Sequence, residues 1–349
     1  LEPYTNRPFS KLERLMTQPR VLFFYASLLT VPMTSRMTIL HDVAISHSLV
    51  EPWTTLLSII GCCSVLFLAV RFCRRYPLVS YSTLFFLINH SIEGSIFNLE
   101  LAYEHRNYIP SMLLFIPLAV VSSHATTTLF HYNRLLKGAV WMAAACMIIS
   151  FGFTTYTYNR VFNSEISLWL HGVDRAPFLS VTHNNLGKVY WGMGLREQAQ
   201  AEFNQAYELD RYFNFPQKGM VFYNLGLYAA YEQRDHGFAL DRFQSAKKYC
   251  PGSPMIWYET ARMHLALGHE NDAAAELNTA LAYWPQNPDL NTLSGLMMAR
   301  QGRCDEALQA AEKAIAVEPL HLSAIAVLAG SHQCKGNYAV AIDFWKTVV

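Results

Sequence analysis

The sequence predicts an all-α protein in two parts, a polytopic group of transmembrane helices followed by an α-solenoid. Two observations support this prediction: long apolar runs fill residues 1–160, and from residue 239 onward a short pattern returns every 34 residues. A run of about 20 apolar residues can span a bilayer, and a fixed period of 20–50 residues is the signature of stacked repeats. We expect a transmembrane region at 1–160, a linker helix at 161–177 and about five repeats at 178–349, the last of them truncated.

Charged residues are distributed unevenly between these parts. Residues 1–160 hold 12 Lys/Arg and 7 Asp/Glu, whereas residues 161–349 hold 15 Lys/Arg and 19 Asp/Glu. The whole chain is 52% hydrophobic and 15% charged, against about 25% charged in an average soluble domain. The sequence has no basic patch of the kind that nucleic acid requires, so we exclude nucleic acid as a partner.

The first part is expected to contain four or five membrane segments. The predicted spans are residues 53–70, 79–92, 111–130 and 138–155. Residues 21–32 are too short to span alone, so a span over 15–32 and an interfacial or re-entrant helix both remain open. Arg71, Arg74 and Arg75 follow the first span, and Arg134 and Lys137 follow the third. Basic turns favour the cytoplasmic side, so we expect a bacterial inner-membrane protein, in contact with lipid, whose repeats are periplasmic.

The repeats combine small residues with prolines at constant offsets. One set of positions 34 residues apart comprises Ala239, Ala273, Ala307 and Ala341; two others comprise Gly268, Gly302 and Gly336, and Pro251, Pro285 and Pro319. Small residues also recur where the two helices of a unit must approach closely: Gly187, Gly226, Ala261, Gly295 and Ala329. This pattern resembles the tetratricopeptide repeat (TPR), a helix–turn–helix unit that is stable only when stacked on its neighbours. The second copy is longer, and we place its extra residues in loops near 214–219 and 232–236.

The TPR resemblance implies a polypeptide partner, because the first helices of such arrays line a concave groove that binds extended peptides. The residues expected to face this groove are Asn184, Lys188, Trp191, Tyr223, Tyr258, Arg262, Leu265, Arg300 and Gln333. Aromatic, arginine and amide side chains suit a polypeptide ligand. The alternative for each of them is a place in the packing between repeats.

A polar segment between two predicted spans is the candidate for chemistry. It contains Glu93, Glu100, Glu104, His105, Arg106 and Tyr108. If the segment is helical, steps of 7 and 4 residues put the three acids on one face. Ionisable groups at the membrane edge are costly unless they are paired or bind something, and Arg106 is suited to neutralising an acid or holding a phosphate. The alternative is a solvated loop.

Residues 104–111 of this segment, Glu-His-Arg-Asn-Tyr-Ile-Pro-Ser, resemble the E-R-x-x-Y-L-P-S segment of the transmembrane and tetratricopeptide-repeat O-mannosyltransferases and their bacterial relatives. Glu104, Tyr108, Pro110 and Ser111 match, whereas the arginine of the family falls on His105. The resemblance implies a C-type glycosyltransferase that takes its sugar from a polyprenyl phosphate and modifies protein. The six residues of the polar segment would then bind substrate or lipid phosphate.

The expected catalytic acid of such an enzyme would lie upstream of Leu1, so no catalytic residue is named and the chain is interpreted as a C-terminal fragment. No cofactor is evident, although a divalent metal would suit the full-length enzyme. The second hypothesis is a non-enzymatic, membrane-anchored TPR scaffold. We expect no metal site in this chain, because the spacing of His41, Asp42 and His47 matches no ligand pattern.

The seven cysteines do not form a disulfide framework. Most lie in or beside apolar runs, where a free thiol acts as a small hydrophobic side chain. Cys304 and Cys334 would lie at the same end of neighbouring repeats, and a bridge between them would need an oxidising compartment. We expect free thiols.

Overall fold

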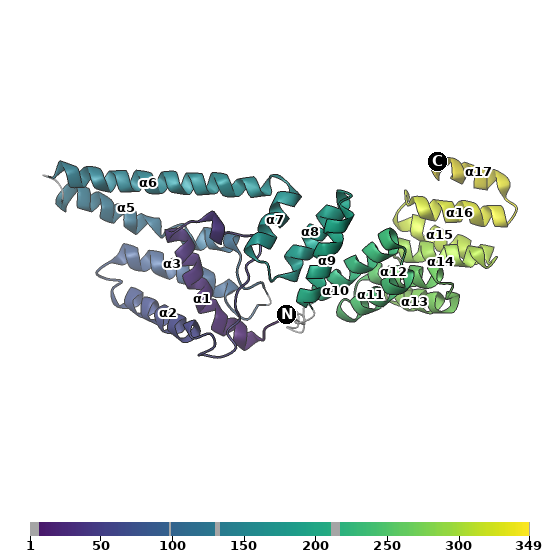
Figure 1. Ribbon diagram of the computed structural model, residues 1–349, viewed down its shortest axis with the longest axis horizontal. Helices are drawn as coiled ribbons and strands as arrows, with labels where there is room; N and C mark the ends of the chain where they lie inside the picture. Colours follow the sequence, from purple (N-terminus) through teal and green to yellow (C-terminus); the bar gives the residue numbers. More distant parts are fainter. Residues whose placement is uncertain (1–6, 98, 130–132, 211–216, 349) are drawn as a thin grey trace. The chain divides into compact units, whose positions relative to one another are not determined.

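The computed structural model describes residues 7–97, 99–129, 133–210 and 217–348, and these residues form helices and no strand (Figure 1). The predicted all-α class is therefore confirmed. The chain divides into two compact units, Leu1–Phe215 and Pro216–Val349. The first unit includes the first repeat, and the second holds the other four. The predicted domain limits at 160 and 177 stay predictions.

Nine α-helices and four short helical turns make up the described part of the first unit. The α-helices are α1 (Lys11–Thr30), α2 (Thr54–Arg71), α3 (Pro77–Glu93), α4 (Tyr108–Ser111), α5 (Phe115–His124), α6 (Arg134–Asn159), α7 (Glu165–Arg175), α8 (Ser180–Gly192) and α9 (Arg196–Asp210). The turns are η2 (Thr34–Arg36), η3 (Glu104–Asn107), η4 (Ala125–Leu129) and η5 (Arg160–Asn163). Val21 and Tyr25 of α1 pack with Phe86 and Ala102 in a buried cluster, so α1 is joined to α3 and to the polar segment before η3.

Two of the described helical stretches are long and apolar enough to cross a membrane. They are α2 and the continuous stretch Arg134–Asn163 formed by α6 and η5. A third candidate joins Glu104–Ser111 to Phe115–Thr128 across a bend of 48°. The apolar run at 21–32 is the second half of α1, whose first half is charged, and α3 has only 17 residues. Length and composition thus support two or three spans, and the four or five predicted stay a prediction.

The second unit is a stack of helix pairs (Figure 1). Its helices are α10 (Gln217–Tyr228), α11 (His236–Tyr249), α12 (Pro254–Ala266), α13 (Glu270–Tyr283), α14 (Pro288–Arg300), α15 (Cys304–Val317), α16 (Leu322–Cys334) and α17 (Tyr338–Val348). Each even-numbered helix packs on the odd-numbered one that follows, and α14 also contacts α12 and α16. The recurring alanines Ala239, Ala273 and Ala307 are fully buried, which confirms their predicted role as packing positions.

The recurring glycines close the turn between the two helices of a repeat. Gly268, Gly302 and Gly336 have φ of 77°, 74° and 79°. This left-handed conformation is one that glycine adopts without steric cost. The 34-residue glycine step in the sequence therefore records a backbone requirement of each turn.

The second repeat differs from the prediction at the end of its first helix. Residues Ala229–Gln233 form a π turn, η6, and Arg234 takes the left-handed conformation (φ 56°) that glycine takes elsewhere. The extra residue is thus absorbed by a wider helical turn and not by the loop that we predicted. The other predicted extension lies partly at residues 214–216, outside the described residues, and Gln217–Gly219 already belong to α10.

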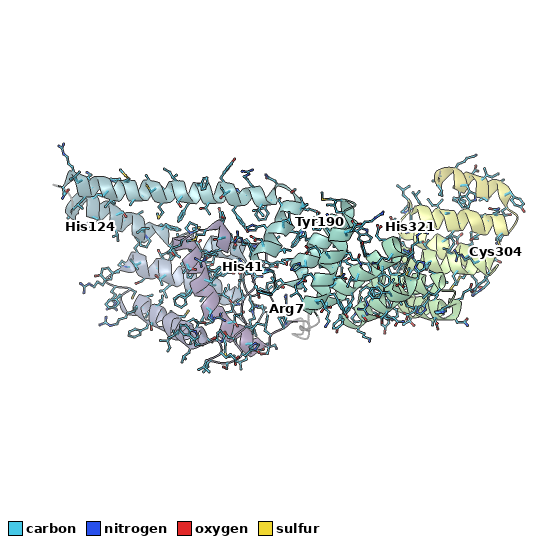
Figure 2. All side chains as sticks on the ribbon, viewed as in Figure 1. Arg7, His41, His124, Tyr190, Cys304 and His321 are labelled. Carbon is cyan, nitrogen blue, oxygen red and sulfur yellow. A yellow bond between two sulfur atoms is a disulfide. The ribbon has the colours of Figure 1, made fainter. Side chains whose placement is uncertain are left out.

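Cys304 and Cys334 form a disulfide, so the expectation of free thiols was wrong for this pair (Figure 2). Cys304 begins α15 and Cys334 ends α16, and because these neighbouring helices run in opposite directions, the two Cα atoms come within 6.0 Å. The other five cysteines form no disulfide within the described residues.

Candidate functional site

The polar segment at 93–108 is not a continuous helix. The helix α3 ends at Glu93, and residues 94–97 and 99–103 are not helical before η3 begins at Glu104. The three acids therefore do not share one helical face, as they would have done in a helical segment. Their positions are set instead by contacts with α1 and with residues 37–44.

Arg14 of α1 holds this non-helical backbone in place. The arginine is fully buried, and its Nε donates to the carbonyl of Ser95 (2.9 Å) and its Nη2 to the carbonyl of Glu93 (2.7 Å). Its Nη1 donates to the carbonyl of Leu99. Main-chain carbonyls outside a helix need donors when they are buried. One planar guanidinium supplies three of them, so Arg14 fixes the course of the segment.

The acids and the arginine of the segment are occupied by protein partners. Arg106 Nη1 donates to the carbonyl of Glu100 (2.6 Å), its Nε lies 3.5 Å from Glu93 Oε2, and its guanidinium lies 4.8 Å from the centre of the Tyr103 ring. Arg7 pairs with the Glu100 carboxylate. Glu93 Oε2 is buried and accepts no hydrogen bond within the described part of the chain. Hydrogen bonds and ion pairs within the protein thus order the segment, although several of its side chains are exposed.

The remaining residues of the predicted site point elsewhere. Glu104 Oε1 accepts hydrogen bonds from the main-chain N–H of Thr38 (2.8 Å) and from His41 Nε2 (3.1 Å). His105 stacks on Tyr103 with ring centres 5.1 Å apart. Tyr108 is 83% exposed. The structure therefore brings Glu93, Glu100 and Arg106 together, and it directs Glu104 towards His41.

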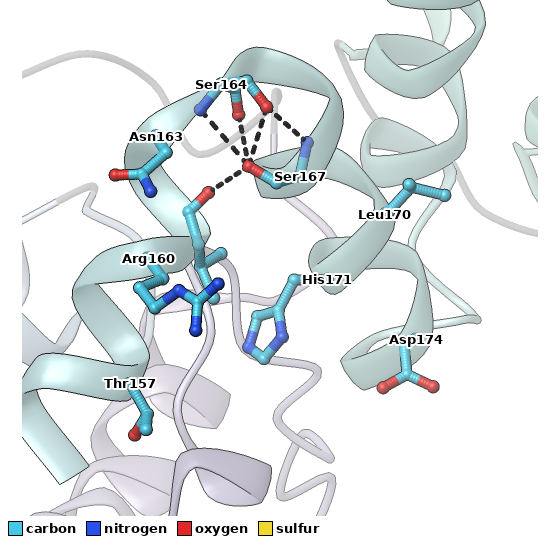
Figure 3. Close-up of a pocket in the computed structure, with 9 residues that line it drawn as sticks. Thr157, Arg160, Asn163, Ser164, Ser167, Leu170, His171 and Asp174 are labelled. Atoms are coloured by element: carbon cyan, nitrogen blue, oxygen red, sulfur yellow. Dashed lines mark hydrogen bonds between the residues drawn. The ribbon is translucent and has the colours of Figure 1, made fainter. Parts of the chain in front are cut away.

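A pocket that the sequence analysis missed lies where α6 and η5 meet α7 (Figure 3). It has a volume of about 720 Å³ and is lined by Thr157, Arg160, Val161, Asn163, Ser164, Ser167, Leu170, His171 and Asp174. His171 Nε2 donates to the carbonyl of Met37 (2.8 Å). Arg160 has no ion-pair partner among the described residues, so it is better placed than Arg106 to meet an external anion. Its signal in the sequence is a lone arginine five residues after the last predicted span, 138–155.

Three of the predicted groove residues belong to the first unit. Asn184 is buried, Lys188 is exposed, and Trp191 packs edge-on against Phe203 with ring centres 6.4 Å apart. Trp191 thus packs within its own repeat. Lys188 is free to meet a ligand.

In the second unit, the first helices carry a cluster centred on Arg262. Arg262 Nη1 donates to the Tyr231 hydroxyl and to Glu259 Oε1 (3.2 Å). The guanidinium lies over the Tyr231 ring at 5.0 Å and over the Tyr258 ring at 5.8 Å. Tyr223 and Tyr258 were predicted as groove residues together with Arg262, whereas Glu259 and Tyr231 were missed. We call Tyr223, Tyr231, Tyr258, Glu259 and Arg262 the tyrosine–arginine cluster.

Burial sets the protonation chemistry of the cluster. Glu259 is 5% exposed, and its Oε2 has no hydrogen-bond partner in the described residues. Burial raises the pKa of the Glu259 carboxyl, although Arg262 opposes this shift. Burial also raises the pKa of the Tyr223 hydroxyl. Burial would lower the pKa of Arg262, but its bonds to Tyr231 and Glu259 raise it above the ordinary value. The cluster therefore keeps a cation at its partly exposed edge, where the Arg262 side chain is 28% exposed.

Polar and charged side chains also lie on the first helices of the later repeats. His321 Nε2 donates to Asp289 Oδ1 (3.0 Å), which ties the start of α16 to the start of α14. Arg300, at the end of α14, is exposed and has no ion-pair partner in the described part of the second unit. Leu265 is half-buried against the apolar core of its repeat, and Gln333 is exposed. The first helices thus combine tyrosine faces with free or partly free cations.

Comparison with known proteins identifies the repeats. Residues 258–320 match the family model of the tetratricopeptide repeat. Similar solved structures include MamA (residues 41 to the end) from Desulfovibrio magneticus RS-1, at 18% identity and a TM-score of 0.41 over 48% of this chain and 92% of that one. YrrB, a TPR protein with an unusual peptide-binding site, has 18% identity and a TM-score of 0.40 over 52% and 90% of the two chains. PilW, a type IV pilus biogenesis factor, has 17% identity and a TM-score of 0.44 over 64% and 90%.

At these identities and TM-scores, the likenesses carry no argument about what this chain binds or does. No curated protein matches the chain. The family match supports the TPR part of the predicted resemblance, and nothing in it supports the O-mannosyltransferase part. The matched residues and the stacked helix pairs show that the chain carries tetratricopeptide repeats, an architecture suited to protein–protein interaction.

Proposed function

We propose that this chain is a membrane-anchored TPR scaffold that binds an extended polypeptide along the first helices of its repeats. The observation that carries the proposal is the tyrosine–arginine cluster on α10, η6 and α12. Tyrosine and arginine are the residues that most often supply binding energy at protein interfaces. Tyr231 and Tyr258 hold the Arg262 guanidinium between their rings, so little side-chain freedom is lost when a ligand binds.

The chemistry of the cluster indicates how a polypeptide would be held. Arg262 offers donors to a main-chain carbonyl or a carboxylate of the ligand. The tyrosine faces offer apolar area to its side chains. Asp289, which is exposed at the start of α14 and bonded to His321, offers an acceptor to a main-chain N–H. The surface therefore provides both donors and acceptors for an extended backbone.

Photo-crosslinking in cells tests this proposal. A photoreactive phenylalanine in place of Tyr258 should capture a polypeptide, which mass spectrometry then identifies. The same residue in place of Tyr283 is the matched control, because Tyr283 is an exposed tyrosine on α13, the second helix of the same repeat. Equal capture at both positions would contradict the proposal that the polypeptide binds along the first helices.

A peptide from the captured polypeptide then allows affinity to be measured. Arg262→Ala should weaken binding by about 10- to 100-fold, since truncating an interfacial hot spot costs roughly 2 kcal/mol or more. The control is Arg303→Ala, because Arg303 is an exposed arginine paired with Glu306 in the turn between α14 and α15. An unchanged affinity for Arg262→Ala would refute the role of the cluster.

We further propose that the helices of the first unit anchor the chain in a bacterial inner membrane and that the repeats face the periplasm. The Cys304–Cys334 disulfide supports this side, since disulfides persist in oxidising compartments. In intact cells, a membrane-impermeant maleimide should label Lys313→Cys, on the exposed face of α15. It should label Cys73, beside the basic turn after α2, only after the membrane is opened. The reverse pattern would invert the topology.

A second candidate function is the C-terminal part of a membrane glycosyltransferase that uses a polyprenyl-phosphate-linked sugar. The observation that favours it is Glu93 Oε2, which is buried without a hydrogen bond 3.5 Å from Arg106 Nε, next to the matched residues 104–111. In this role Arg106, which lies beside Glu93 and Glu100, would bind the lipid phosphate, and the repeats would hold the acceptor protein. Arg106 would have to leave Glu100 to donate to the phosphate.

Binding of a polyprenyl-phosphate analogue tests this second candidate. A photoreactive analogue should label the full-length protein in membranes, and Arg106→Ala should reduce the labelling about tenfold or more, because a bidentate, charge-assisted contact is lost. Arg160→Ala serves as the comparison, since Arg160 lines the pocket between α6, η5 and α7. Labelling that depends on Arg160 alone would exclude the predicted segment as the phosphate site.

A further inference from the structure

Three potential metal ligands meet at the turn between α12 and α13. His264 lies in the last turn of α12, His269 is the residue before α13, and Asp272 lies in the first turn of α13. One ligand atom from each lies within 4.8 Å of the other two. The sequence alone predicted no metal site, because the spacing of His41, Asp42 and His47 matches no ligand pattern. The tight turn around Gly268 is what brings the three side chains together.

The buried histidine carries an unsatisfied atom. His264 is 7% exposed, and its Nδ1 has no hydrogen-bond partner in the described residues. The Asp272 carboxylate is too distant for a hydrogen bond, at 3.9 Å from Nδ1. Leaving a buried polar atom unpaired costs about 1–3 kcal/mol. A cation bonded to Nδ1 would remove this cost, so the geometry points to a ligand and not only to packing.

The neighbouring repeats show that the turn itself does not require these residues. In the next repeat, Met298, Arg303 and Glu306 occupy the three positions, and Arg303 Nε donates to Glu306 Oε1 (2.7 Å). In the last repeat, the positions hold His332, Asn337 and Val340. Both turns have the same glycine conformation as the turn at Gly268. Two imidazoles and a carboxylate are thus peculiar to this repeat.

We propose that His264, His269 and Asp272 bind one divalent transition-metal ion of the zinc class. Imidazole nitrogens suit zinc, copper and nickel, and two histidines with one carboxylate recur in three-ligand zinc sites whose fourth position is open. Metal–ligand bonds of about 2.0–2.2 Å require the ligand atoms to approach one another to about 3.3 Å. His269 and Asp272 are exposed, and His269 makes no side-chain hydrogen bond to the helix start, so both can turn inward around Nδ1 of the buried His264.

The ion would join the end of α12 to the start of α13. Its open fourth position would face solvent, because two of the three ligands are exposed. A water molecule or a donor side chain of a bound protein could complete the coordination. This site is independent of the proposed polypeptide groove, since it uses none of the tyrosine–arginine cluster.

Metal titration of the full chain tests the proposal. The protein is purified in detergent, its affinity tag is removed, its free thiols are alkylated, and Zn²⁺ is titrated by calorimetry and Co²⁺ by visible absorption. We expect one ion per chain with micromolar affinity and a tetrahedral Co²⁺ spectrum. Asp272→Asn and His269→Ala should each weaken Zn²⁺ binding by at least about tenfold, a loss of the size seen when the shell of a metal site is damaged. Both side chains are exposed, so the metal-free fold should be unchanged by circular dichroism.

His332→Ala is the matched control. His332 occupies the position of His264 in the last repeat, and its Nδ1 is also buried without a hydrogen-bond partner in the described residues, but its repeat lacks the other two ligands. Zn²⁺ affinity should be unchanged in this variant. Binding that is absent below millimolar Zn²⁺, or that survives both Asp272→Asn and His269→Ala, would show an adventitious ion only and overturn the proposal.

Discussion

Replacing Gly226 with alanine tests a packing rule for the repeats. Where the two helices of a repeat touch, a small side chain on one helix faces a large side chain on the other. A Cβ atom at Gly226 would lie 2.7 Å from Phe243 Cε1, 2.9 Å from Cδ1 and 3.0 Å from Cζ. Phe243 is fully buried, so its ring has no free space into which to move. In the next repeat, the equivalent positions hold Ala261 and Leu277, which pack in one core cluster. A larger residue on one helix is thus matched by a smaller one on the other.

Two opposite effects determine how much Gly226→Ala changes the free energy of unfolding. Alanine is favoured over glycine inside a helix by about 1 kcal/mol, whereas overpacking a well-filled core costs about 1–3 kcal/mol. We expect Gly226→Ala to destabilise the second repeat by about 1 kcal/mol. Adding Phe243→Leu recreates the pair found in the next repeat and removes the clash. The double variant should therefore be more stable than the sum of the single changes by roughly 1–2 kcal/mol, within the usual coupling of contacting residues.

Hydrogen–deuterium exchange of the full chain in detergent measures the stability change of the second repeat, because exchange reports the opening free energy of individual helices. The peptides to follow cover α10 and α11. Gly330→Ala is the control, since Gly330 lies inside α16 and an added Cβ meets nothing within 4 Å. It should stabilise its helix by about 0.5–1 kcal/mol. If Gly226→Ala also slows exchange, or shows no coupling to Phe243→Leu, the packing rule is wrong.

Three further changes probe other parts of the chain. Arg14→Ala removes the side chain that donates to three main-chain carbonyls of the polar segment, so we expect rapid proteolysis of that segment. Arg14→Lys should restore little of the protection from proteolysis, because lysine lacks the planar fork of donors. Replacing Cys304 and Cys334 by serine should lower the free energy of unfolding by about 2–4 kcal/mol, and a reductant should shift the urea midpoint of the wild type to that of the variant. Burial would lower the pKa of His183, but its hydrogen bond to Glu202 raises it overall; the stabilisation is therefore complete at low pH and lost as pH rises through the folded-state pKa. The melting temperature should drop more in His183→Gln at about pH 5.5 than at about pH 8, and an equal drop would contradict the ion pair.

The repeats were predictable from the sequence because their requirements are local. A left-handed turn selects glycine at Gly268, Gly302 and Gly336, and close helix contact selects small residues such as Gly226. These requirements recur every 34 residues, so they are visible without a structure. The prediction that Tyr258 and Arg262 face a groove followed from the same register, since both residues lie on the first helix of one repeat.

Contacts between distant residues were not predictable in this way. Glu259 looks like an ordinary surface acid in the sequence, but it is buried, and the hydroxyl of Tyr231 from the π turn of the preceding repeat lies against it. The disulfide likewise depends on the antiparallel order of α15 and α16. Each pairing spans about one repeat of sequence, a distance at which spacing alone does not show which side chains meet.

Residues 1–160 show most clearly which features are local to the sequence and which depend on tertiary contacts. The sequence by itself determined that residues 1–160 are apolar helices separated by a polar segment, because hydrophobic runs and charges are local properties. Only the tertiary structure decided what that segment does, since the donors that order it come from Arg14, about 80 positions earlier in the chain. The same reason applies to His264, His269 and Asp272: the residues were visible in the sequence, but only the turn between α12 and α13 makes them neighbours.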